Sequence, residues 1–151
     1  MPGLHYEDFE VNKVYEHSQA RSVTQFDDIW YSCMTQNTQP LHINSHFSET
    51  KGLYKKPLFN SAYTLSIVIG QAVTDTTRGT LIALLALDDM QFPQSVFEGD
   101  TLYTRTTVIS KEISKDHPEG GVVVLQHDGF NQKRELVASC KRKVLVRRRA
   151  A

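Results

Sequence analysis

The chain has 151 residues, the usual length of one domain, and we expect residues 1–151 to form a single domain. Hydrophobic residues make up 40% and charged residues 23% of the sequence, a composition that excludes a disordered chain and supplies one core. The 17 basic and 17 acidic residues cancel, so the chain lacks the broad positive charge of nucleic-acid binding proteins.

No segment of the sequence has the pattern of a membrane-spanning helix or of a secretory signal. The longest apolar run is Leu81–Leu87, and a membrane helix needs about 20 such residues. The first residues hold Glu7 and Asp8 and no hydrophobic segment, so we expect no secretory signal. Cys33 and Cys140 make neither a disulfide framework nor a C-x-x-C motif. We therefore expect a cytoplasmic protein.

The first 50 residues predict one amphipathic helix. Residues 1–19 show no regular pattern, and Arg21–Val23 suggests a short strand. Thr24 and Asp27 have the spacing of a capping box at a helix start. The helix ends before Pro40, and Ser45–Lys51 predicts one further turn. Apolar residues recur at helical spacing and predict a buried face: Phe26, Ile29, Trp30, Cys33 and Met34.

A second helix is predicted from Leu58 to Val73, after Pro57. Its apolar residues cover nearly every face, so we expect it to be buried rather than amphipathic. A domain of this size can bury such a helix by curling a sheet around it.

The second half of the chain predicts that sheet. Four long segments rich in β-branched residues are separated by Gly, Pro and Asn turns: Thr80–Phe92, Thr101–Ile113, Gly121–Phe130 and Leu136–Val146. We expect an antiparallel meander, in which each strand pairs with the next. The predicted fold class is α+β, a single hot-dog fold with an antiparallel sheet wrapped around a buried central helix. Because exposed sheet edges favour pairing between chains, we expect a homodimer or a higher homo-oligomer.

The sequence lacks the motifs of several common classes of enzyme. The sequence contains no dinucleotide-binding, P-loop or nucleophile-elbow motif. His42 and His46 are four residues apart, but no clear third metal ligand lies near them. We expect neither a metal nor a cofactor.

Residues 37–42, Asn-Thr-Gln-Pro-Leu-His, carry the most informative motif. The segment resembles the hydratase motif of the MaoC-like dehydratases, the (R)-specific enoyl-CoA hydratases. Asn37 stands where that family has its catalytic Asp, and Gln39 stands where it has Asn. The segments Tyr6–Phe9, Pro57–Gly70 and Phe92–Leu102 are similar to further family segments in the same order, so the resemblance covers most of the chain.

The resemblance implies a hydratase or dehydratase that acts on a 2-enoyl-CoA or 3-hydroxyacyl-CoA. Asn60-Ser61 and Gly129–Gln132 are most similar to the branch of mesaconyl-CoA, itaconyl-CoA and β-methylmalyl-CoA hydratases. His42 and Asn37 are the implied catalytic pair, although His42 could instead stabilise the turn. The implied substrate-binding residues are Thr38, Gln39, Asn60 and Ser61, and Ser61 stands where a family Gly offers its N–H to the thioester carbonyl. Plain helix capping is the alternative for Asn60 and Ser61.

The amide of Asn37 leaves the mechanism open, because Asn cannot accept a proton. Either His42 alone transfers the proton and Asn37 positions water or substrate, or the chain binds acyl-CoA with weak or no catalysis. A third alternative is an acyl-CoA thioesterase. Two lysines, Lys55 and Lys56, are either solvated or contact coenzyme A phosphates. The same alternatives apply to the basic segment 141–149, which could also be a partly frayed C-terminal strand.

Overall fold

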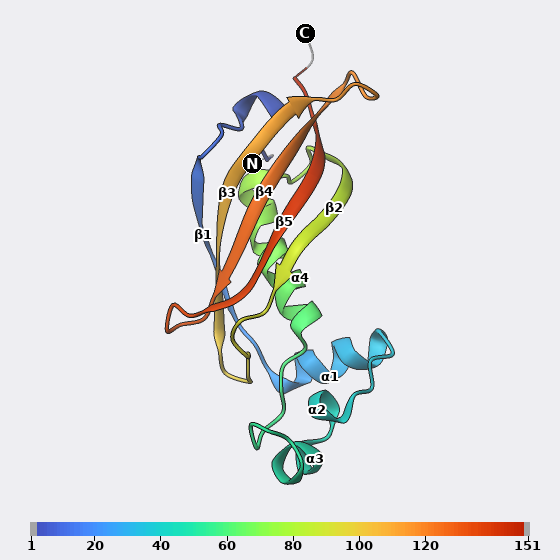
Figure 1. Cartoon of the computed structure of the whole chain (residues 1–151), viewed down its shortest axis with the longest axis vertical. Coiled ribbons are helices and arrows are strands. Elements are labelled where there is room, and N and C mark those ends of the chain that lie inside the picture. The colour runs from blue at the N-terminus through green and yellow to red at the C-terminus, as the bar shows by residue number, and fades with distance from the viewer. Residues whose placement is uncertain (1–2, 150–151) are drawn as a thin grey trace.

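The computed structural model describes residues 3–149, which form one curved antiparallel sheet around a long helix, with three short helices at one end (Figure 1). The elements are η1 (Tyr6–Asp8), β1 (Val14–Ser22), α1 (Gln25–Met34), α2 (Pro40–Ile43), α3 (Ser45–Thr50), α4 (Ser61–Thr76), β2 (Leu81–Gln91), β3 (Thr101–Ile113), β4 (Gly120–Phe130) and β5 (Leu136–Arg147). No helix in the described part of the chain is both long and apolar enough to cross a membrane.

The sheet has five strands in the order β1-β3-β4-β5-β2, which differs from the predicted meander of four. β2 pairs with β5 instead of β3, with Leu84 opposite Val144. β1 begins at Val14, whereas residues 1–19 were expected to be irregular. Only His17 is buried on β1, so this strand lacks the apolar alternation that reveals a strand in sequence. Its backbone pairs with β3.

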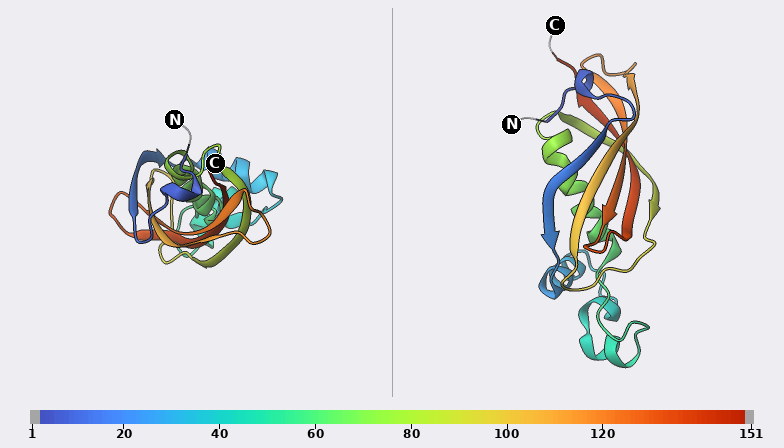
Figure 2. Two further views of the ribbon diagram at one scale, coloured as in Figure 1. Left: turned by 90° about the horizontal axis from the view of Figure 1, so that it is seen from above. Right: turned by 90° about the vertical axis from the view of Figure 1, so that its left-hand side faces the viewer.

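α4 lies in the concave side of the sheet, as predicted, and the view from above shows the strands curving around it (Figure 2). The helix begins at Ser61 rather than Leu58, because the backbone of Asn60 is extended and its side chain caps the helix. Gly129 on β4 permits the close contact: a Cβ atom there would lie 2.3 Å from Cγ2 of Val68 on α4. This arrangement is the hot-dog fold.

The helix α1 was predicted to bury its apolar side, but in the structure it buries its polar side. The capping box of Thr24 and Asp27 is present. The buried side chains of the helix are nevertheless Asp28 and Ser32, while the apolar side is exposed to solvent. We call this exposed side the α1 face; its residues are Phe26, Ile29, Trp30 and Met34. The reversal occurs because the polar side of α1 makes hydrogen bonds to the start of α4.

The C-terminal strand is not frayed. β5 continues to Arg147, and the next two arginines pair with acidic side chains of η1. Arg148 pairs with Glu7, and Arg149 pairs with Asp8.

Candidate active site

The start of α4 is held against α1 by one buried cluster of hydrogen bonds. The backbone N–H of Asn60 donates to Asp28 Oδ1 at 2.8 Å, and its side-chain Nδ2 donates to Ser32 Oγ at 3.2 Å. Asn60 Oδ1 also accepts from the N–H of Ala62. Asp28 and Ser32 reach the same residue because side chains four apart lie on one face of a helix. Asn60 is therefore the N-cap of α4, with its own polar groups engaged by protein atoms.

His42 lies on α2, which begins at Pro40 in the position where a helix tolerates proline. Its Nδ1 lies 2.6 Å from the carbonyl oxygen of Leu58. Because a carbonyl oxygen can only accept a hydrogen bond, Nδ1 carries a proton in this contact, and in the neutral imidazole Nε2 is therefore the nitrogen with the lone pair. The imidazole is 12% exposed, so Nε2 belongs to a ring that is mostly shielded but reaches the surface.

A buried carboxylate lies behind this imidazole. Asp28 Oδ2 is 3.8 Å from His42 Nδ1, and the Asp28 side chain is 2% exposed. Burial raises the pKa of the Asp28 carboxyl, while the Asn60 N–H and the charge of protonated His42 act in the opposite direction. No motif in the sequence singles out Asp28. Its only signal was a polar pair, Asp28 and Ser32, on the side of α1 opposite the apolar residues.

The remaining motif residues lie in the loop between α1 and α2. Asn37, Thr38 and Gln39 are all exposed, and the backbone N–H of Asn37 donates to the carbonyl of Ser32 at 2.9 Å. Among residues 3–149, no hydrogen bond joins the side chain of Asn37 to His42. The one acidic side chain that the described chain brings within 4 Å of the imidazole is thus Asp28, which comes from α1 and not from the 37–42 motif.

Ser61 is the first residue of α4. Its N–H belongs to the helix N-terminus, where backbone donors lack intrahelical partners and the helix dipole is positive. Within the described chain, this N–H donates to no other group. The Leu58 carbonyl that fixes His42 is three residues before Ser61, so the imidazole and the helix start belong to one local unit.

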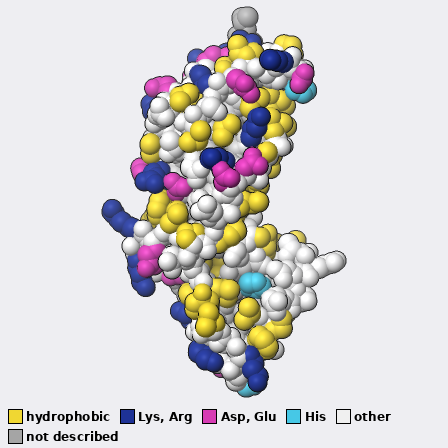
Figure 3. Space-filling view, viewed as in Figure 1, with side chains coloured by type: hydrophobic (Ala, Val, Ile, Leu, Met, Phe, Trp, Pro, Cys, Tyr) yellow, Lys and Arg dark blue, Asp and Glu magenta, His cyan; other side chains and the backbone are white. Residues whose placement is uncertain are grey.

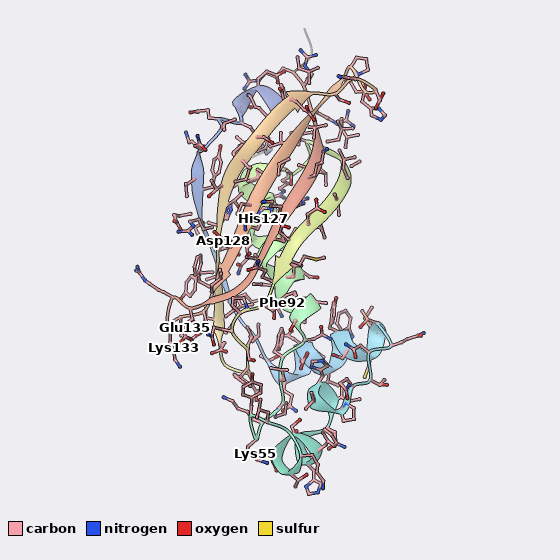
Figure 4. All side chains as sticks on the ribbon, viewed as in Figure 1. Lys55, Phe92, His127, Asp128, Lys133 and Glu135 are labelled. Atoms are coloured by element: carbon pink, nitrogen blue, oxygen red, sulfur yellow. The ribbon has the colours of Figure 1, made fainter. Side chains whose placement is uncertain are left out.

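The candidate phosphate contacts lie apart from this unit. Lys55 extends from the loop after α3 at one end of the molecule (Figure 4), where its Nζ donates to the carbonyl of Thr50. Lys56 Nζ lies over the Phe97 ring at 3.9 Å from its centre. Arg148 and Arg149 pair with Glu7 and Asp8 of η1, and the C-terminal end of the chain lies at the opposite end of the molecule from the short helices (Figure 1).

Comparisons with known proteins find a matching family and two similar sequences. The MaoC like domain matches residues 8–128. The chain is 32% identical to a β-methylmalyl-CoA dehydratase of Chloroflexus aurantiacus and 28% identical to a mesaconyl-CoA hydratase of Cereibacter sphaeroides, over 98% and 97% of its length. It spans 41% and 42% of those proteins, less than half of either.

A solved structure from Archaeoglobus fulgius, described as a monoamine oxidase regulatory protein, superimposes with a TM-score of 0.86 at 25% identity. That alignment covers 99% of this chain and 98% of the other. The fold, the motif around His42 and the match over residues 8–128 together show that the chain belongs to the MaoC-like dehydratase family.

Proposed function

We propose that this chain adds water to a 2-enoyl-CoA thioester and removes it from the corresponding 3-hydroxyacyl-CoA, without a cofactor. The observation that carries the proposal is the orientation of His42. Its Nδ1 proton is bound by the Leu58 carbonyl, and its Nε2 lone pair is left for a proton from water. The relatives named as hydratase and dehydratase support the same reaction.

In the proposed reaction, His42 Nε2 takes a proton from water while the water oxygen bonds to C3 of the substrate. The electron pair of the double bond moves toward the thioester oxygen, where the N–H of Ser61 stabilises the negative charge. The proton then returns from His42 to C2, so that water is added and the enzyme is unchanged. Asn37, Thr38 and Gln39 are proposed to position water and substrate from the exposed loop.

The substrate class is proposed to be a thioester with its own carboxylate, such as mesaconyl-CoA. An Asp at position 37 would repel such a carboxylate, whereas the amide of Asn37 can donate a hydrogen bond to it. The names of the two curated relatives support this class.

Exchange of Asn37 for Asp tests the substrate class. We expect Asn37→Asp to shift the ratio of kcat/KM for crotonyl-CoA over mesaconyl-CoA at least tenfold toward crotonyl-CoA, because one close like charge costs about 1.4 kcal/mol or more. Thr35→Ser, at the end of α1 and outside the proposed substrate contacts, serves as a control and should leave the ratio near the wild-type value. An unchanged ratio in Asn37→Asp would refute the assignment.

The reaction itself is tested with purified protein and a panel of enoyl thioesters. Loss of the enoyl absorbance without release of free thiol supports hydration. Thiol release would instead show a thioesterase, and binding without turnover would show an acyl-CoA-binding protein.

The chain is further proposed to act as a homodimer or a larger homo-oligomer. Two surface hollows of about 730 and 590 Å³ are present on the monomer, and neither is lined by His42 or Asn37. A second copy that covers the exposed α1 face would add walls near His42, because α1 and α2 lie in contact.

A further inference from the structure

Asp28 is a buried carboxylate that the family motif does not account for. One oxygen is occupied by the Asn60 N–H at 2.8 Å, and the other lies 3.8 Å from His42 Nδ1. No other acidic side chain among residues 3–149 lies within ion-pair distance of His42. A carboxylate that is 2% exposed is costly to retain without a positive partner, and His42 is the group placed to provide that charge.

From this geometry we infer that Asp28 is the positioning residue of His42 and supplies, from α1, the negative charge that Asn37 does not carry. The inference rests on the proposed function. It extends that function by assigning the carboxylate of the site to a residue outside the 37–42 motif.

The role follows from the charge of the ring during turnover. When Nε2 takes a proton, the imidazole becomes a cation while Nδ1 still donates to the Leu58 carbonyl. Asp28 is not in hydrogen-bond contact with the ring at 3.8 Å, so it receives no proton. It stabilises the cation by charge alone, which is effective because both groups are shielded from water.

The Oδ1 oxygen of Asp28 connects this carboxylate to the start of α4. By accepting from the Asn60 N–H, Asp28 holds the residue before Ser61 in place. The same carboxylate therefore sets the position of the proposed base relative to the proposed donor for the thioester oxygen.

Asp28→Asn separates charge from packing, because the amide oxygen can still accept from the Asn60 N–H. We expect kcat for a thioester that wild type hydrates to fall about 10- to 100-fold, with KM within about twofold of wild type. The acidic limb of the kcat/KM profile should move to lower pH, because the cationic form of the ring loses the negative charge 3.8 Å from Nδ1.

Two control variants isolate the effect. Asp27→Asn removes the adjacent carboxylate, which caps α1 and pairs with Arg21, and should leave the acidic limb at the wild-type pH. Ser32→Ala removes the other α1 contact to Asn60 and should also leave the limb unchanged.

Asp28→Glu covers the case in which Asp28→Asn does not fold. It keeps the charge on a longer side chain, so we expect reduced kcat with an acidic limb close to wild type. The role of Asp28 would be overturned if Asp28→Glu shifted the acidic limb of the pH profile, or if Asp28→Asn kept the wild-type kcat and acidic limb. Either result would leave the proposed hydration intact. Loss of the proposed function itself would show differently, as full activity in His42→Ala.

Discussion

Two backbone groups define the chemistry proposed for the site. The carbonyl of Leu58 determines which nitrogen of His42 is free, and the N–H of Ser61 offers a donor at the start of α4. Neither group depends on its own side chain, so ordinary alanine scanning would miss both. Proline offers a way to remove one of them.

Ser61→Pro deletes the N–H of Ser61 with little effect on the helix. Proline is favoured at the first helical position, and the extended backbone of Asn60, with φ −63° and ψ 121°, is compatible with a following proline. We expect kcat for hydration to fall about 10²–10³-fold, the usual cost of removing an oxyanion donor, with thermal stability nearly unchanged. Ser61→Ala keeps the N–H and should stay within about threefold of wild type. Equal activity in the proline and alanine variants would remove this donor from the mechanism.

The sequence singled out His42, Asn37 and Ser61 because the resemblance to the family rests on one short motif and one helix start, and their roles remain predictions. It did not identify Asp28, which is 14 residues before His42. The capping box drew attention to Asp27, and nothing in the local pattern distinguishes two adjacent aspartates. Only the packing of α1 on α4 shows that one is a cap and the other faces the imidazole.

At the scale of elements, the four strands after α4 were predictable, whereas β1 and the order of the strands were not. The bounds of β3 and β5 agree with the apolar pattern to within one residue. The pairing of β2 with β5 depends on how the sheet curls around α4, which no local signal encodes. Prediction from local sequence has the same limit for α1. The periodicity of this helix reveals an apolar side but does not tell whether the sheet or another surface covers that side.

A polar chain crosses the concave face between β1, β3 and β4. His17 Nδ1 contacts Asp75 Oδ2 at 2.8 Å, His17 Nε2 contacts Thr106 Oγ1 at 2.7 Å, and Thr106 Oγ1 contacts His127 Nδ1 at 2.8 Å. His127 lies on β4 in the middle of the sheet (Figure 4). Its burial, followed by the charges of Arg142 and His17, lowers the pKa of His127 to about 3.

This lowered pKa predicts a loss of stability in acid. Below pH 6.5 the unfolded chain binds a proton at His127 that the folded chain refuses, so folding stability falls by about 1.4 kcal/mol per pH unit toward pH 3. His127→Asn keeps a partner for Thr106 and lacks the titration. The stability of wild type relative to this variant should therefore drop by about 2.5 kcal/mol between pH 7 and pH 4.5, measured by urea unfolding. His117→Asn, at an exposed position, should show no such change, and a constant difference for His127→Asn would contradict the assignment.

At the scale of the whole molecule, several large hydrophobic side chains are exposed on the surface of the described chain. Figure 3 shows hydrophobic side chains on the surface both around the short helices and along the sheet edge where β2 runs. The α1 face belongs to this surface, with Phe26 75% exposed, and so do the outward residues Leu84 and Leu85 of the edge strand β2. Such surfaces are typical of interfaces between chains.

We predict that the 151-residue chain sediments as a dimer or larger species and that Trp30→Asp weakens this assembly at least tenfold. An aspartate at position 30 would bury a charge in the contact. Ile113→Asp changes an equally exposed hydrophobic residue at the far end of β3 and should leave the assembly intact. Sedimentation of wild type as a monomer at micromolar concentration, or an unaltered Trp30→Asp assembly, would show that the α1 face is not the interface.

The most direct test of the account is steady-state hydration of an enoyl-CoA thioester by His42→Ala beside His46→Ala. His46 is exposed on α3, four residues away, and makes no side-chain hydrogen bond in the described chain. The account predicts that His42→Ala loses about 10²–10⁴-fold in kcat while His46→Ala retains wild-type activity. Wild-type turnover by His42→Ala would contradict it.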